Sequence, residues 1–400
     1  MAEYNFLRAM TRQTLSQIYD KIEGLVIKLP GPVQGPIMKE LRPIKELFLE
    51  QRTPRLLLVD SHPESVGILF EALLDRPCWT PDLEDRFLAQ DQDWISFGNS
   101  QRGRLSLKTL SHTTSLQRIR THKPDAIIFP LGAQADPTDK ETQEALANVC
   151  RLVETFLEEE PPLATPPLLM ALLAQGLDVE STQQRRKELR KIFLERPELA
   201  RVYAGSLLLG GRPRLRADQS VDHGSLHTPF TEARQEGIEL LANEMPREAR
   251  LEFARIFGAR QAQLNIAHTL NKSFSAVAFV LGTQPIPFAD LPLLTTLQTG
   301  LVAGTIYISG QELDMKLGAQ FLAAMGINFG AAVVMRETAR GLAKFVPGWG
   351  HAISGGVAGA GTYAIGRAAA AHFIEQTTMK DAQRLFQSVR KKKMAELDQE

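Results

Sequence analysis

Apolar positions recur at helical spacing at the start of the chain. Between Tyr4 and Ile27 they return at steps of three and four, which predicts an amphipathic helix. The segment Leu29–Pro36 is not expected to continue a helix, because each proline lacks an amide donor and restricts the residue before it. A second helix is expected over Ile37–Gln51. We assign residues 1–52 to an N-terminal helical lead-in.

Short apolar runs alternate with helical patterns over residues 53–245. Helical periodicity over Thr142–Glu159 and Ser181–Arg196 separates the later runs. Strands that alternate with helices predict a doubly wound, mostly parallel sheet, so this region is expected to be an α/β domain. The runs expected as strands are Arg55–Asp60, Arg104–Leu110, Asp125–Leu131, Leu168–Ala174 and Val202–Leu209.

The composition changes beyond Phe274, where Gly and Ala accumulate and charged residues become sparse. Asp, Glu, Lys and Arg are missing from Leu291–Gln311, Leu317–Met335 and Phe345–Gly366. This shift predicts a Gly/Ala-rich all-α domain, which we place at residues 246–378. A basic C-terminal helix or tail, residues 379–400, is expected to follow it.

The composition also limits the partners and the compartment. The 46 basic and 46 acidic residues give a formal net charge of zero, so no global field attracts nucleic acid and no such partner is expected. The chain has two cysteines, Cys78 and Cys150, which exclude a disulfide framework and a four-cysteine zinc site and fit a reducing compartment. The N-terminus lacks the apolar core of a secretory signal. We therefore expect a cytoplasmic protein.

The turn after the first strand is where a phosphate-binding loop would lie. Such a loop needs G-x-x-x-x-G-K-[ST], because glycines let backbone amides surround the phosphates while Lys and the hydroxyl supply charge and a magnesium contact. Here Asp60 and Ser65 replace the glycines, Val66 the lysine and Gly67 the hydroxyl residue. The carboxylates of Asp60 and Glu64 would also repel a triphosphate. The sequence therefore predicts a degenerate nucleotide site and no cofactor.

Four phrases of the sequence carry a family resemblance. They are LRPIKELFLEQRTPRLLLV at Leu41–Val59, EGIELLANEMPREARLEFAR at Glu236–Arg255, PIPFADLPLLTTLQ at Pro285–Gln298 and FVPGWGHAISGGVAGAGTYAIG at Phe345–Gly366. Through them the chain resembles the bacterial Era-like (TRAFAC) GTPases that carry a C-terminal YcjF-like helical domain of unknown function. The resemblance covers nearly the whole chain, and its C-terminal phrases are the most specific. It implies a P-loop GTPase-like α/β domain with N-terminal helices, followed by an all-α domain.

Two further motifs that this family carries are degenerate. The Asp-x-x-Gly element that senses the γ-phosphate corresponds at best to Leu110–Thr113, where His112 stands and neither the aspartate nor the glycine is present. The guanine-reading Asn-Lys-x-Asp corresponds in one alignment to Gln175–Asp178, which retains only Asp178. The resemblance thus implies a pseudo-GTPase, a G-domain fold that is used as a scaffold and is not an enzyme.

A metal site and a basic helix face have simpler explanations. Asp222, His223 and His227 have a spacing that suits a metal on a helix, but a loop is predicted there, so we interpret them as exposed loop residues and predict no metal site. The basic residues between Arg185 and Lys191 are interpreted as one solvated helix face.

Two uncharged segments raise the question of a membrane. Leu291–Ser309 and Leu317–Met335 each have 19 residues. As helices they would span about 28 Å, close to the roughly 30 Å of a hydrocarbon core. Polar residues such as Gln298 and Asn328 interrupt both segments and argue against crossing. Peripheral association, true insertion and a soluble helical bundle all stay open from the sequence.

Small residues and a basic run provide candidate contacts. Small residues at four-residue spacing let helices approach closely, in membranes and in soluble bundles alike. A basic run after the last apolar helix would be attracted to an anionic leaflet. The candidate residues for membrane or partner contact are Gly326, Gly330, Gly355, Gly359, Arg390, Lys391, Lys392 and Lys393.

These observations favour a catalytically inactive GTPase-like scaffold. We expect its C-terminal helical domain to associate peripherally with the inner face of the cell membrane, and the protein to bind a protein partner or another copy of itself. One alternative is a soluble adaptor or oligomerisation module without lipid affinity. Another is a nucleotide-binding protein or GTPase with a nonstandard site around His62, His112 and Asp178.

Overall fold

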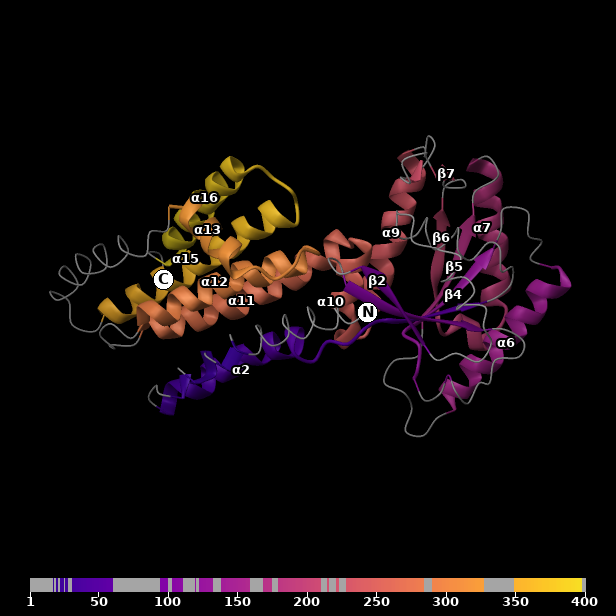
Figure 1. The fold of residues 1–400 in the computed structure, drawn as a ribbon, viewed down its shortest axis with the longest axis horizontal. Coiled ribbons are helices and arrows are strands. Elements are labelled where there is room, and N and C mark those ends of the chain that lie inside the picture. Colours follow the sequence, from indigo (N-terminus) through magenta and orange to yellow (C-terminus); the bar gives the residue numbers. More distant parts are fainter. Residues whose placement is uncertain are drawn as a thin grey trace. The chain divides into compact units, whose positions relative to one another are not determined.

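The computed structural model describes much of the chain, in two compact units (Figure 1). The helical unit comprises Met1–Gln51, Ser100–Arg102 and Arg260–Glu400, and the α/β unit comprises Arg52–Asn99 and Gly103–Ala259. The described residues are 17–27 except 18, 21 and 25, then 31–59, 94–99, 103–110, 119, 122–131, 138–158, 168–174, 179–209, 214–215, 221–222, 228–283, 290–326 and 349–397.

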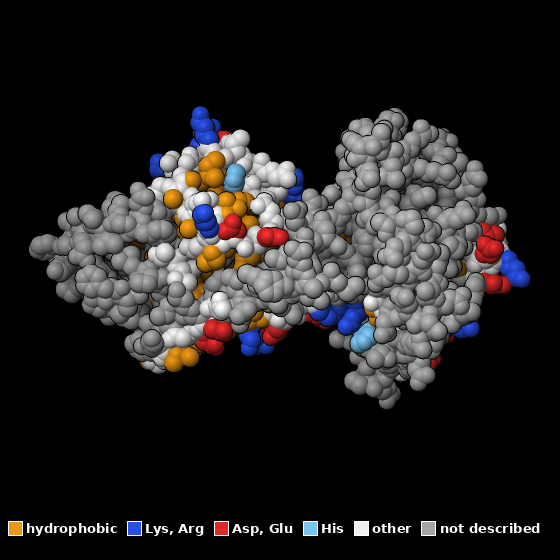
Figure 2. Space-filling model, viewed as in Figure 1, with side chains coloured by type: hydrophobic (Ala, Val, Ile, Leu, Met, Phe, Trp, Pro, Cys, Tyr) orange, Lys and Arg blue, Asp and Glu red, His pale blue; other side chains and the backbone are white. Residues whose placement is uncertain are grey.

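The helical unit is built around the long helix α11. Its main described helices are α2 (Gly31–Phe48), α11 (Arg260–Thr283), α12 (Asp290–Ile308), α13 (Met315–Ala324), α15 (Trp349–Phe373) and α16 (Met379–Leu397). α11 packs against α2, α12 and, most extensively, α15, and α15 packs in turn against α16. Val302, Phe321, Ile365 and Phe386 meet in one apolar cluster of this unit. Figure 2 shows further apolar side chains between charged ones on one face of the unit.

α2 contains prolines that were expected to prevent a helix. The expectation for Leu29–Pro36 is wrong, because α2 begins at Gly31 and includes Pro36 and Pro43. Each of these prolines leaves the carbonyl group four residues earlier without a helical partner. Those carbonyl groups belong to exposed residues at positions 32 and 39, so water can hydrogen-bond to them. The opposite face of α2 is buried and packs on α11, which stabilises the helix; it carries Ile37, Leu41, Ile44 and Phe48.

A six-stranded sheet forms the centre of the α/β unit. The strand order is β2-β3-β1-β4-β5-β6, and the strands are parallel except β2, which pairs antiparallel with β3. The five apolar runs expected as strands are confirmed as β1 (Arg55–Val59), β3 (Gly103–Leu110), β4 (Ala126–Leu131), β5 (Leu168–Ala174) and β6 (Tyr203–Leu209). β2 (Ile95–Asn99) was not expected. β7 (Arg214–Leu215) and β8 (Val221–Asp222) form a separate antiparallel pair.

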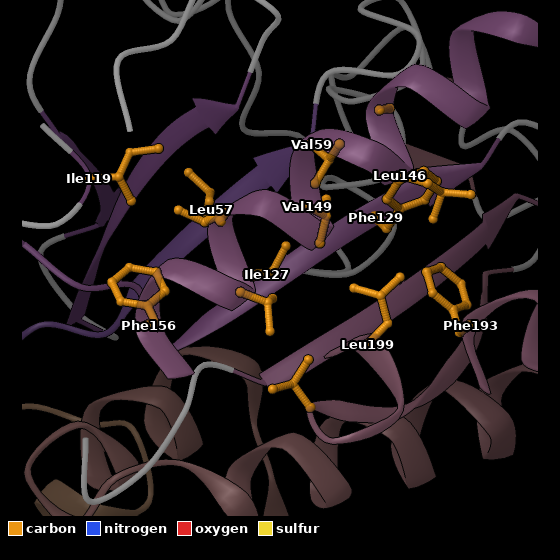
Figure 3. Packing of buried hydrophobic residues seen from close by; sticks show 14 residues of the cluster. Leu57, Val59, Ile119, Ile127, Phe129, Leu146, Val149, Phe156, Phe193 and Leu199 are labelled. Carbon is orange, nitrogen blue, oxygen red and sulfur yellow. The ribbon is translucent and has the colours of Figure 1, made fainter. Parts of the chain in front are cut away.

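Large apolar side chains fill the core of the α/β unit. The unit also contains α6 (Lys140–Leu157), α7 (Val179–Leu194), α8 (Pro197–Ala200), α9 (Thr228–Glu244) and α10 (Arg247–Phe257). Figure 3 shows Leu57 of β1 and Phe129 of β4 in one cluster with Val149 and Phe156 of α6. Phe193 of α7 packs edge-on against Phe129, with ring centroids 5.7 Å apart. This core holds β1 and β4 as the central pair of the sheet.

The unit boundaries differ from the expected segments at two places. The lead-in belongs to the helical unit, because the buried face of α2 packs against α11. α10 belongs to the α/β unit, although residues from 246 onward were assigned to the helical domain. α10 packs against β3 and α9, and it buries Leu251, Phe253 and Ile256. Gly258 ends it with a left-handed φ of 66°, just before the boundary.

Candidate functional site

The parallel strands end together at one edge of the sheet. Val59 at the end of β1 pairs with Leu110 at the end of β3, and Leu131 at the end of β4 pairs with Leu173 of β5. Ligands of α/β proteins bind beyond the carboxyl ends of such strands. The chain segments that follow β1, β3 and β5 carry the expected degenerate motifs. Those motif residues, Asp60, Ser65, Val66, Gly67, His112 and Asp178, lie outside the described residues, as does His62.

The opposite edge of the sheet is held by a buried ion pair. The Arg52 guanidinium donates to both carboxylate oxygens of Asp125, at 2.7 and 2.6 Å, and the Arg55 amide donates to the same carboxylate at 2.9 Å. Only 3% of the Asp125 side chain is exposed. The hydrogen bonds to Asp125 raise the pKa of Arg52 above its ordinary value. The Arg52 amide donates to the Glu248 carbonyl at 2.6 Å, so the pair also ties α10 to the sheet.

Two glycines singled out by the sequence lie inside the helical unit. Gly355 and Gly359 of α15 are buried against α11. A methyl group at position 355 would lie 2.8 Å from the Phe279 carbonyl oxygen, and one at 359 would lie 3.0 Å from the Phe279 Cβ. The space beside each of these glycines is therefore filled by atoms of α11. Gly326 follows α13 with φ of 75°, and Gly330 lies outside the described residues.

Polar side chains fix the register of α15 against its neighbours. The Asn271 amide of α11 donates to the Tyr363 carbonyl at 3.0 Å, and Ser275 donates to the Asn271 side-chain oxygen at 3.3 Å. Gln298 of α12 donates to the Thr362 hydroxyl at 3.2 Å. These bonds pair groups that would be costly to bury alone, so they favour this packing over a shifted one.

The basic run near the C-terminus is divided between two faces of α16. Arg390, Lys391 and Lys392 are exposed, whereas Lys393 is half-buried. Arg390 and Lys393 are three residues apart and share one face of the helix. Lys393 donates to the Glu396 carboxylate at 2.7 Å, and its ammonium nitrogen lies 5.5 Å from the centroid of the Tyr363 ring. The hydrogen bond to Glu396 raises the pKa of Lys393. The run thus touches α15 through its last member.

Three basic residues near Tyr363 were not singled out by the sequence. The ring of His268 in α11 meets that of Tyr363 edge-on, with centroids 6.4 Å apart. The pKa of His268 is lowered, first by burial and then by the nearby charges of Lys272 and Arg367. His268 and Lys272 are four residues apart on one helix, as are Tyr363 and Arg367 on another, so each pair shares a face. That spacing was visible in the sequence, but the meeting of the two faces requires the fold.

The Asp222, His223 and His227 grouping, which was interpreted from the sequence as exposed loop residues, lies largely outside the described residues. Asp222 ends β8, whereas His223 and His227 lie outside the described residues. Within the described ranges, no group of three or more His, Cys, Asp or Glu side chains is arranged to hold a metal ion.

The first uncharged segment corresponds to α12. It packs against α11, α13 and α15, and its side chains Leu297, Leu301 and Ile306 are fully covered. The second segment is described only as far as residue 326, and α13 covers its first part. None of the helices among the described residues has the combination of length and apolarity that a membrane span requires.

Comparisons with known proteins give weak likenesses. No protein-family model and no curated protein matches the chain. The solved chains that resemble it include two from an oligomerised bacterial dynamin pair described as a mechanism for long-range sensing and tethering of membranes. The first has a TM-score of 0.29 and 10% identity over 97% of this chain and 74% of that one. The second has a TM-score of 0.27 and 9% identity over 96% of this chain and 76% of that one. TM-scores this low do not establish a shared fold, and the Era-like resemblance stays a prediction.

Proposed function

We propose that the chain is a catalytically inactive GTPase-like scaffold. In this proposal a doubly wound α/β domain docks a protein partner, and the helical unit associates with the surface of a membrane or with a second copy of the chain. The observation that carries the proposal is the residue set Asp60, Ser65, Val66 and Gly67, which directly follows the central strand β1.

The position of β1 in the sheet explains why these replacements bear on nucleotide binding. β1 lies between β3 and β4, and the turn beyond its carboxyl end is where a phosphate loop would have to lie in a GTPase-like sheet. Without the loop lysine, the phosphates lose their charge partner. Removing one partner of a buried charge pair costs about 2–5 kcal/mol, which corresponds to roughly 30-fold to several thousand-fold in affinity. The carboxylates of Asp60 and Glu64 add repulsion.

The helical unit has a different character. Its glycine contacts, its buried polar pairs and its apolar cluster form a continuous packed interior among the described residues. A chain that keeps this packing while it lacks phosphate, magnesium and base motifs is suited to binding and not to catalysis. This contrast supports a scaffold with the helical unit as its contact surface.

Nucleotide binding tests the inactive α/β domain. Fluorescent GTP, GDP and ATP are titrated into the purified full chain with and without magnesium, and no saturable binding in the micromolar range is expected. A matched variant, Asp60→Gly/Ser65→Gly/Val66→Lys/Gly67→Ser, rebuilds the loop and is expected to gain magnesium-dependent binding. Saturable binding by the unaltered chain would contradict the proposal. A rebuilt variant that folds but gains nothing would contradict the assignment of this turn as a lost phosphate loop.

Flotation tests the membrane part separately. The full chain is expected to float with vesicles that contain phosphatidylcholine and phosphatidylserine. A chain that stays at the bottom of the gradient with these vesicles would exclude the membrane role and favour the soluble adaptor.

A further inference from the structure

Side chains from three helices surround Tyr363 on the helical unit. His268 and Lys272 come from α11, Tyr363 and Arg367 from α15, and Lys393 from α16; we call these five residues the Tyr363 cluster. His268 meets the Tyr363 ring edge-on, and the Lys393 ammonium lies over the same ring. Lys272 and Arg367 both act on the charge of His268. The tight pairing of α11 with α15 thus gathers cations that lie far apart in the sequence.

The cluster has an excess of positive charge. Lys272, Arg367 and Lys393 are cationic, and the carboxylate that contacts them in this cluster is that of Glu396, through Lys393. That carboxylate is 48% exposed, and the Lys393 side chain is 41% exposed, so their pair is screened by solvent and free to exchange partners. Arg390 is exposed three residues before Lys393 on the same face of α16 and extends the positive surface.

An anionic membrane surface fits this combination best. The whole chain has zero formal net charge, so an attraction to anionic lipid has to arise locally. Each Lys or Arg near an anionic leaflet contributes about 1 kcal/mol, and tyrosine favours the headgroup level because its ring is apolar and its hydroxyl polar. Tyr363 is partly exposed and lies among lysine and arginine side chains, so both its ring and its charged neighbours suit the headgroup region.

We infer that the Tyr363 cluster is the surface through which the helical unit contacts the phosphate-bearing headgroups of an anionic membrane. The inference rests on the proposed membrane association and names the residues that carry it. It also gives the C-terminal basic run a role through its neighbours on α11 and α15, which the sequence alone did not connect to it.

Vesicle binding by matched variants tests the inference. The cluster variant is Lys272→Gln/Arg367→Gln/Lys393→Gln. The control variant, Lys187→Gln/Arg190→Gln/Lys191→Gln, removes the same charge from exposed positions of α7 in the α/β unit. With vesicles of phosphatidylcholine and phosphatidylserine, the cluster variant is expected to bind about 100-fold more weakly than the unaltered chain. The control is expected to bind like the unaltered chain. Circular dichroism confirms that both variants are folded.

A second measurement keeps the inference testable if the triple variant is unstable. The histidine resonances of the unaltered chain are titrated with and without soluble dihexanoyl phosphatidylserine, and His268→Gln assigns the His268 signal. A headgroup phosphate bound beside Lys272 and Arg367 offsets their charge, so the pKa of His268 is expected to rise. An unchanged pKa at saturating lipid would overturn direct contact.

The outcomes separate this inference from the proposed function. If the unaltered chain does not bind anionic vesicles, the membrane role itself fails, and the inference fails with it. If the unaltered chain binds and the cluster variant binds equally well, the membrane role stands and the inference is overturned. Equal losses in the cluster and control variants would likewise overturn it, because the attraction would then be general charge. Loss in the cluster variant alone, with the His268 shift, supports it.

Discussion

The α/β unit and the helical unit achieve close packing by opposite means. In the α/β unit, large rings such as Phe129, Phe156 and Phe193 fill the space between sheet and helices. In the helical unit, α15 approaches α11 where Gly355 and Gly359 have no side chain at all. The first core is damaged when volume is removed, the second when volume is added. The expected nucleotide motifs follow the strands in the sequence, whereas the described core rings belong to β4, α6 and α7.

The largest effect is expected from removing a core ring of the α/β unit. Phe129→Ala should lower the free energy of unfolding by about 3–5 kcal/mol, because it removes apolar contacts and leaves a cavity beside Phe193. Hydrogen exchange measured by mass spectrometry should show faster exchange in β4 and β5, with α11 and α15 unchanged. Phe129→Leu is the control and should have a smaller effect. Equal acceleration in both units would show that the two do not respond separately.

The buried ion pair of the α/β unit should matter more than a surface pair of the helical unit. Arg52→Ala leaves the Asp125 carboxylate buried without its main partner, and we expect a loss of about 3 kcal/mol in urea denaturation. The control is Arg42→Ala, which breaks the exposed pair of Arg42 with Glu46 and should cost about 0.5 kcal/mol or less. Similar losses for the two variants would contradict the structural role assigned to Asp125.

A single added methyl group should damage the helical unit at one glycine and not at another. Gly355→Ala should destabilise it by about 1–3 kcal/mol, because the methyl would strike the Phe279 carbonyl of α11. Gly361→Ala is the matched control on the same helix, since nothing lies within 4 Å of a methyl there. It should stabilise the unit by about 0.5–1 kcal/mol through helix propensity. Thermal unfolding measures the stability of both variants. If both substitutions shifted the unfolding temperature in the same direction, the close contact at Gly355 would be refuted.

The smallest expected effect is a pH dependence that belongs to the helical unit. The folded-state pKa of His268 is lowered from 6.5 by burial and by Lys272 and Arg367. Between that lowered pKa and 6.5 the unfolded chain binds more protons at this residue, so stability should fall as the pH falls through this window. The unaltered chain and His268→Gln are compared by urea denaturation at neutral and mildly acidic pH. If His268→Gln loses as much stability on acidification as the unaltered chain, the pH dependence does not arise from His268.

Much of the α/β unit could be predicted from the sequence because a parallel strand that is buried on both faces, as Leu56–Val59 of β1 is, consists of apolar residues. Such strands appear as continuous apolar runs, as in Arg55–Val59 and Leu168–Ala174. β2 was missed because Ile95–Asn99 contains Ser, Gly and Asn and pairs on one side only. The helix was expected from Ile37, across Pro43, but its first residues, 31–36, were missed because tertiary packing of α2 outweighs the local preference against a helix there.

The candidate site was predictable only where its parts are neighbours in the sequence. The basic run at Arg390–Lys393 is visible as a run. The contact of Lys393 with Tyr363 depends on the packing of α15 against α16, which no local pattern encodes. The Arg52–Asp125 pair joins residues separated by 73 positions, so the sequence offered no signal for it. The loss of the nucleotide motifs remains a prediction from the sequence.

Two stretches far apart in the chain supply the described helices of the helical unit, and this has a consequence for biosynthesis. α2 emerges from the ribosome early, but its partner α11 is made only after the intervening α/β unit. Domains generally fold as units during synthesis, so the α/β unit can fold before α11, the partner of α2, has been made. Until then the apolar face of Ile37, Leu41 and Phe48 lacks α11, the helix on which it packs in the folded unit. The nascent chain should therefore be a client for chaperones that shield apolar helices.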